Sequence, residues 1–175
     1  EVRRLARGGR VEIVGICAGL QMMGERIEDP SKVESGQLTA AGLGLLPVAT
    51  RFAAEKTLTR VACVHGPSGR RVFGYEIHHG RTLVPEGQGI MRREDGEAVG
   101  VAAADHRVWG TYLHGVFDAD EFRRWFVDRL RERRGLRPLG RVAARYDLEP
   151  GLDRLADVVR SKLRMDVIYR LIGLR

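Results

Sequence analysis

A cysteine lies on a glycine-flanked turn near the start of the chain. In RVEIVGICAGLQMMG (residues 10–24), Cys17 stands two residues after Gly15 and two before Gly19. Small residues at this spacing are typical of a strained turn from a strand into a helix. Such a turn would hold the thiol outward at the helix start, favour its thiolate, and offer the Ala18 N–H as an oxyanion donor. Cys17 is therefore a candidate nucleophile, with a buried structural cysteine as the alternative.

A nucleophilic cysteine needs a partner base, and the chain has five histidines. His114 ends the apolar run VWGTYLH and precedes a glycine, so it is the best candidate for the general base. His65 in HGPSG and His106 in ADHRV are expected to be exposed turn residues. For His78 and His79, an active-cleft position for one of them and a structural role for both stay open.

The surrounding runs predict an α/β fold with helices at both ends of a mixed sheet. Short strands are expected at 10–16, 45–52, 57–64, 71–82, 98–105 and 107–114, and a loop-rich stretch at 28–48. Helices are expected at 1–9, 18–27, 118–135 and 152–171. Ile27 should lie on the second helix, and Asp118 or Asp120 should cap the third.

Several side chains are expected in the core because they recur at helical spacing. They are Leu20, Met22, Met23, Ile27, Phe122, Trp125, Phe126 and Leu130, followed in the last helix by Leu155, Val158, Val159, Leu163, Val167, Ile168 and Leu171.

The composition favours one cytoplasmic domain. The chain has 175 residues, of which 43% are hydrophobic, and its two cysteines form no disulfide framework. No apolar run approaches the roughly 20 residues that span a bilayer. The net charge of +7 would suit nucleic acid, but aromatic residues make up only 6% and charges of both signs alternate in RRWFVDRLRERRGLR (123–137). That pattern favours a solvated helix face, and a basic nucleic-acid-binding module stays as an alternative.

Two motifs resemble those of known enzymes. GICAGLQMMG is similar to the nucleophile segment of class I glutamine amidotransferases, and LHGVFD to their histidine segment. Together with DPSKVES, GLGLLPVATRFAAEKT and GYEIHHGRT, in this order, they resemble the C-terminal glutaminase domain of cobyric acid synthases, from about Val11 onward. The resemblance implies a flavodoxin-like mixed sheet flanked by helices.

The resemblance also implies roles for individual residues. Cys17 would form a thioester with the side chain of glutamine, and His114 would transfer the protons. Gln21 would help hold the substrate, with an exposed helix residue as the alternative. Many class I enzymes carry a glutamate two residues after the histidine, where this chain has Val116. The pair would then act as a dyad or use Asp118 or Glu76 as the orienting acid.

The resemblance further implies a single domain over residues 1–175 that lacks the first strand or strands of its fold. An upstream synthetase domain would use ATP and Mg²⁺ to convert adenosylcobyrinic acid a,c-diamide into adenosylcobyric acid, while the glutaminase domain itself needs no cofactor or metal. Because an oxyanion donor would come from the missing part, the 175 residues alone are expected to hydrolyse glutamine poorly.

Other functions share these motifs. They are the glutaminase subunit of a ligase that amidates cell-wall lipid precursors, a cobyrinic acid a,c-diamide synthase, and a cysteine hydrolase or peptidase. A non-catalytic scaffold is a further alternative.

Overall fold

The computed structural model describes residues 1–174, and the chain divides into two compact units, residues 1–143 and the residues from 144 on. The first unit contains α1 (Val2–Arg7), β1 (Ile13–Ile16), α2 (Ala18–Met23), β2 (Arg26–Glu28), β3 (Thr39–Ala41), β4 (Ala49–His65), a 3-10 turn (Gly66–Ser68), β5 (Arg71–Thr82), β6 (Met91–Arg92), β7 (Val101–Ala102), β8 (Val108–Thr111) and α3 (Asp120–Arg133). The second contains α4 (Glu149–Lys162) and α5 (Met165–Leu171).

The predicted α/β class is confirmed, and the strands divide between two mixed sheets. A three-stranded sheet has the order β1-β8-β7, in which β1 and β8 are parallel and β7 is antiparallel. The five-stranded sheet has the order β3-β2-β4-β5, with β6 also paired to β4. In the smaller sheet Ile16 is opposite Thr111, so β1 and β8 end side by side.

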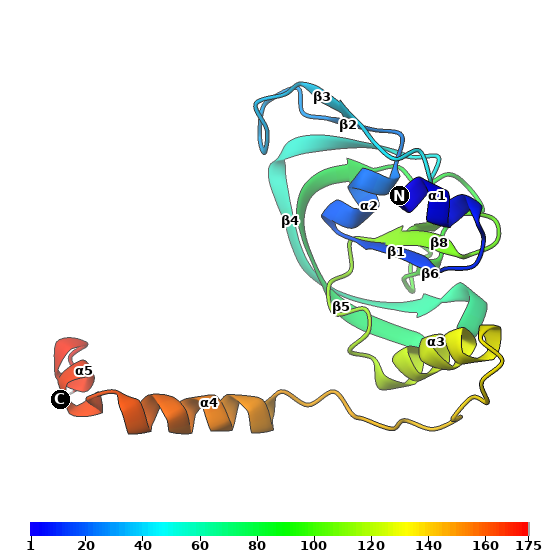
Figure 1. Cartoon of the computed structure of the whole chain (residues 1–175). Helices are drawn as coiled ribbons and strands as arrows, with labels where there is room; N and C mark the ends of the chain where they lie inside the picture. The colour runs from blue at the N-terminus through cyan, green and yellow to red at the C-terminus, as the bar shows by residue number, and fades with distance from the viewer. Residues whose placement is uncertain (175) are drawn as a thin grey trace. The chain divides into compact units, whose positions relative to one another are not determined.

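The second sheet is dominated by one long hairpin. Residues 45–52 and 57–64 were expected to form two strands, but 49–52 and 57–64 belong to the single 17-residue strand β4, and 45–48 precede it outside any strand. A register shift between Phe52 and Thr57, where β4 pairs with β5, interrupts the ladder without ending the strand. Such bulges bend a strand. Figure 1 shows β4 and β5 curving around α2, β1 and β8.

Two clusters of buried side chains form the core. One lies around Trp109, Leu113 and Phe122, and Trp125 and Phe126 pack against it, as expected for core aromatics. The other lies under α2, around Leu20, Met23 and Tyr112. The two clusters therefore join β8 to α3 and to α2.

The helix after Cys17 is shorter than predicted. It ends at Met23, and Gly24 takes an extended conformation that starts the path into β2. A side chain at Gly24 would come within 2.6 Å of the Val48 carbonyl oxygen, so the chain passes close to that segment. Ile27 consequently lies in β2 and not in the helix. Met22 is 54% exposed and was wrongly expected in the core.

The arginine-rich helix α3 is anchored by ion pairs. Arg124 pairs with Asp128 at 2.8 Å, and Arg133 reaches Glu12 beside β1 at 3.0 Å. The side chain of Glu12 is almost completely buried, so this part of the helix is not simply a solvated face. The expected aspartate cap is also wrong: Ala119 occupies the N-cap position, and no side chain caps the helix.

The second unit departs most from expectation. The single helix predicted over 152–171 is two helices, because the backbone leaves the helical conformation at Leu163 and Arg164. No residue of α4 or α5 is buried, and Leu155 and Val158 are more than half exposed. The apolar residues recur in the sequence at helical spacing as predicted, but no other part of this unit that the structure describes packs over them. Among the described residues no helix is both long and apolar enough to cross a membrane.

The expectation that His65 is an exposed turn residue is wrong. His65 is the last residue of β4 and is 1% exposed. Its ring lies 4.9 Å from that of Phe122 and 5.0 Å from that of Trp125. Its Nδ1 accepts the backbone N–H of Ser68 and so caps the 3-10 turn. Burial lowers the pKa of His65 to about 4.

This buried histidine predicts an acid limit on stability. Its pKa falls from the ordinary value of about 6.5 to about 4 on folding, so the unfolded chain binds the extra proton first. The stabilisation is present above the unfolded pKa and is lost as the pH falls through the folded pKa. We expect the free energy of unfolding to drop by about 2 kcal/mol between pH 7 and pH 5 from this residue alone.

Urea unfolding followed by tryptophan fluorescence at both pH values measures this drop. His65→Gln should remove most of it, whereas His106→Gln, which removes only a minor contribution to the lowered pKa of His65, should change it little. An equal pH dependence in the wild type and the His65→Gln variant would contradict the assignment.

Candidate active site

Cys17 lies on the strand-to-helix turn that the sequence predicts. It follows β1 directly, has φ of 53° and occupies the N-cap position of α2. Its backbone N–H donates to the Thr111 carbonyl at 2.8 Å, which ties the turn to the end of β8. A side chain at Gly15 would meet the backbone of Gly19 at 2.6 Å, so only glycine fits at 15. A side chain at Gly19 would meet nothing within 4 Å, so the expected need for glycine there is wrong.

The thiol of Cys17 is half-buried against β5. Its Sγ lies 3.9 Å from the carbonyl oxygen of Ile77, to which the S–H can donate. Burial raises the pKa of the thiol, while a hydrogen bond from the Ala18 N–H lowers it. The carboxylate of Glu34 raises this pKa further and the ammonium of Lys56 opposes it. The net direction is upward, because burial outweighs the thiolate-favouring effect of the Ala18 N–H at the turn, so the thiol needs a base.

His114 lies three residues beyond the end of β8, and its main chain is bonded to β5. The His114 N–H donates to Tyr75 O at 2.8 Å, and the Tyr75 N–H donates to His114 O at 3.2 Å. Its ring stacks on the Tyr75 ring at 5.1 Å with an interplanar angle of 10°. The Nε2 atom is buried and has no hydrogen-bond partner. The ring is therefore held in place with a nitrogen free for proton transfer.

The fold brings Cys17 and His114 to one edge of the smaller sheet. Each follows the carboxyl end of a strand, and β1 and β8 are adjacent, parallel and paired up to Ile16 and Thr111. Both residues also contact the same stretch of β5, Cys17 at Ile77 and His114 at Tyr75. The carboxyl edge of parallel strands is where open α/β sheets bind ligands. This edge is therefore the candidate active site.

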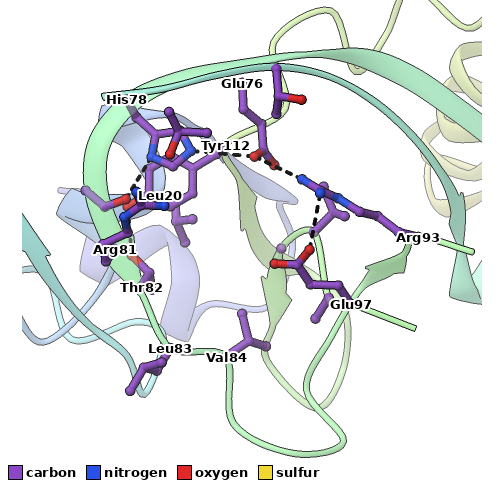
Figure 2. Close-up of a pocket in the computed structure, with 16 residues that line it drawn as sticks. Leu20, Glu76, His78, Arg81, Thr82, Leu83, Val84, Arg93, Glu97 and Tyr112 are labelled. Carbon is purple, nitrogen blue, oxygen red and sulfur yellow. Dashed lines mark hydrogen bonds and ion pairs between the residues drawn. The ribbon is translucent and has the colours of Figure 1, made fainter. Parts of the chain in front are cut away.

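The two acids considered as partners of His114 lie in different surroundings. The Glu76 carboxylate is 3.6 Å from His78 Nε2 and 3.3 Å from Arg93, so it is engaged away from His114 (Figure 2). Asp118 lies close to Gly115, the residue that follows His114. Its Oδ2 would be 2.7 Å from a Cβ atom placed on Gly115. Val116 is buried in the core, so that position contributes packing only.

Gln21 lies one turn after Cys17 and is 7% exposed, so the alternative of an exposed helix residue is wrong. Its side chain lies beside the Tyr112 hydroxyl and lowers the pKa of that phenol. The two groups meet over Gly80, where an added side chain would come within 2.7 Å of Gln21 Nε2 and 2.6 Å of the hydroxyl. Gly80 thus leaves the room in which Gln21 is held.

A cavity of about 310 Å³ lies beside this cluster. Figure 2 shows His78, Tyr112 and Leu20 together on one side of it and Arg93 and Glu97 on the other. His78 thus lines a cavity, while His79 is bonded to Ala53 O at 3.0 Å. Sequence reasoning did not single out Tyr112, although a tyrosine directly after a buried strand must find a partner for its hydroxyl.

Comparison with known proteins agrees with this geometry. The model of the CobB/CobQ-like glutamine amidotransferase domain matches residues 1–122 of the 175. The chain belongs to this family. The match contains the Cys17 turn, the cavity and His114, and the predicted relationship to cobyric acid synthases is confirmed by the relatives that follow.

Curated relatives of this amidotransferase chain include two cobyric acid synthases. That of Nitratidesulfovibrio vulgaris is 47% identical over 98% of this chain and 38% of the relative. That of Thermodesulfovibrio yellowstonii is 39% identical over 99% and 36%. The adenosylcobalamin biosynthesis bifunctional protein CobDQ of Leptospira interrogans is 45% identical over 97% of this chain and 20% of its own. The chain thus spans between a fifth and two fifths of the length of these relatives.

Residues 1–174 contain no group of three or more His, Cys, Asp or Glu side chains that could hold a metal ion.

The raised pKa of Cys17 predicts a distinct alkylation profile. A thiol with a pKa above the ordinary value of about 8.5 should react with iodoacetamide at a rate that still increases beyond that pH. The measurement is the alkylation rate of the Cys17 peptide by mass spectrometry across the pH range. Cys63, which is buried and has a pKa raised to about 11, serves as a slower internal reference. A rate that reaches its plateau below about pH 7 would refute the burial argument.

Proposed function

We propose that this chain is the glutaminase domain of a cobyric acid synthase. It hydrolyses glutamine to glutamate and ammonia, and the ammonia amidates a corrinoid. The family match supports the reaction class, and the identity of 47% to a cobyric acid synthase supports the acceptor. The observation that supports the mechanism is that Cys17 and His114 each follow the carboxyl end of a strand, and these two strands, β1 and β8, are paired in parallel.

The proposed first half-reaction forms a thioester. The Cys17 thiol transfers its proton to His114 and attacks the side-chain carbonyl carbon of glutamine. A buried Nε2 without a partner suits His114 for taking that proton, and the raised pKa of the thiol explains why a base is needed. The Ala18 N–H, which lowers the pKa of the cysteine thiol, is proposed to stabilise the oxyanion. The C–N bond then breaks, and ammonia leaves with the proton from His114.

The proposed second half-reaction releases glutamate. His114 takes a proton from water, the hydroxide oxygen attacks the thioester, and the C–S bond breaks. The sulfur regains its proton, so the resting thiol is restored and the atoms balance over the cycle. Gln21, fixed one turn beyond Cys17, is proposed to hold the amino-acid part of the substrate.

The acceptor is proposed from the relatives. A synthetase part that uses ATP and Mg²⁺ would activate carboxylates of adenosylcobyrinic acid a,c-diamide, and ammonia from Cys17 would convert them to the amides of adenosylcobyric acid. We place this reaction in the cytoplasm, and the partners proposed for the chain are glutamine and, through the synthetase, the corrinoid. Neither nucleic acid nor a membrane is part of the proposal.

Substitution at the two site residues tests the mechanism. Cys17→Ser should lower glutamate release by about 1,000-fold or more, and His114→Asn by about 100-fold to 10,000-fold, because each removes a group that takes part in bond making or proton transfer. Glutamate release by the protein joined to its synthetase part is the measurement. His106→Asn, an exposed turn histidine, is the matched control and should retain full activity.

The same preparation tests the acceptor. With ammonium salt in place of glutamine, Cys17→Ser should still amidate the corrinoid, since the synthetase no longer depends on the thiol. Amidation of a cell-wall lipid precursor in place of the corrinoid would support the rival ligase. Undiminished glutaminase activity of Cys17→Ser would eliminate the cysteine mechanism.

A further inference from the structure

Tyr112 stands between the Cys17 turn and the cavity beside it. It follows β8 directly, and its ring belongs to the buried cluster against which Cys17 packs. It also lines the cavity (Figure 2). One aromatic side chain thus adjoins both the proposed nucleophile and the hollow next to it.

The hydroxyl of Tyr112 is the centre of a buried polar cluster. It lies 2.7 Å from the Thr82 hydroxyl, which lies 2.6 Å from that of Thr50. It also lies beside the side chain of Gln21, as the close approach of both groups to Gly80 shows. Burial raises the pKa of this phenol, so it keeps its proton and can donate at neutral pH. Because Gly80 has no side chain, Tyr112 and Gln21 can approach each other there.

The ring of Tyr112 is held from the other side by His78. The two rings are stacked, with centroids 3.7 Å apart and an interplanar angle of 18°. His78 is itself fixed, because its Nδ1 donates to Gly80 O at 2.7 Å and its Nε2 faces the Glu76 carboxylate at 3.6 Å. Arg93 holds the same carboxylate oxygen at 3.3 Å. The contacts thus run from Arg93 through Glu76 and His78 to Tyr112, which lies beside the amide of Gln21.

We infer that Tyr112 is a positioning residue for the substrate, because its hydroxyl fixes the buried amide of Gln21 relative to Cys17. The inference rests on the proposed glutaminase function and adds to it a residue that takes no part in bond making or proton transfer. Loss of the hydroxyl leaves the Gln21 amide short of a partner in a buried place and free to take other rotamers. Recognition of the amino-acid part of glutamine then weakens, while the intrinsic reactivity of Cys17 is kept.

Two reagents for the same sulfur separate positioning from reactivity. A glutamine-mimicking diazo-ketone needs the amino-acid site, whereas iodoacetamide needs only the thiol. In Tyr112→Phe, which keeps the stacked ring, labelling of Cys17 by the diazo-ketone should be about 5-fold to 10-fold slower, the effect of one lost hydrogen bond. The iodoacetamide rate should stay within about 2-fold, since a purely structural defect would change both. Tyr169→Phe, an exposed tyrosine of α5, is the matched control and should change neither rate.

Thr82→Val provides an independent variant, because it removes the partner of the hydroxyl and leaves the tyrosine in place. It should slow diazo-ketone labelling by a smaller factor, about 2-fold to 5-fold, and leave iodoacetamide unchanged. Equal changes with both reagents, or none with either, in a folded Tyr112→Phe or Thr82→Val protein would overturn the inference. If the wild-type protein reacted with iodoacetamide but not with the diazo-ketone, the proposed function itself would fall.

Discussion

The parallel pairing of β1 with β8 determines where the candidate catalytic residues Cys17 and His114 lie. Each strand is four residues long, and the register sets Ile16 against Thr111 at their carboxyl ends. The next residue of one strand is Cys17, and the third residue beyond the other is His114. A slip of one residue in this register would turn side chains to the opposite face. The N–H of Cys17, bonded to the carbonyl of Thr111, fixes the register at the site itself.

The hairpin of β4 and β5 packs against this pair of strands, and β5 contacts both Cys17 and His114. Successive residues of β5 point to opposite faces. The Tyr75 ring stacks on His114, while Glu76 and His78 face the cavity. Alternate side chains of one strand thus support His114 and line the cavity. This division explains why Glu76, although next to Tyr75 in the sequence, is engaged away from His114.

Local patterns in the sequence predicted the two main residues of the candidate site but few of the residues that pack around them. Gly-x-Cys-x-Gly after an apolar run predicted the turn at Cys17, and an apolar run ending in His-Gly predicted the position of His114, because both depend on neighbouring residues only. The cluster around Tyr112 depends on which face of β5 meets β8, which no local pattern encodes. His65 was misplaced because a turn motif was taken to mean exposure, whereas packing of α3 against β4 buries it. In α4 the apolar spacing was real, but spacing identifies a face and not what covers it.

The sulfur of Cys17 is close to a main-chain oxygen, that of Ile77, and its own N–H is bonded to another main-chain oxygen. Peptide carbonyls are present whatever residue occupies a position. Homologous proteins can therefore diverge at position 77 and still keep the nucleophile where it stands, provided that the residue there fits a strand. Evolutionary variation at that position would then be a poor guide to its importance. The main-chain contact with the sulfur would be conserved although the side chain at position 77 is not.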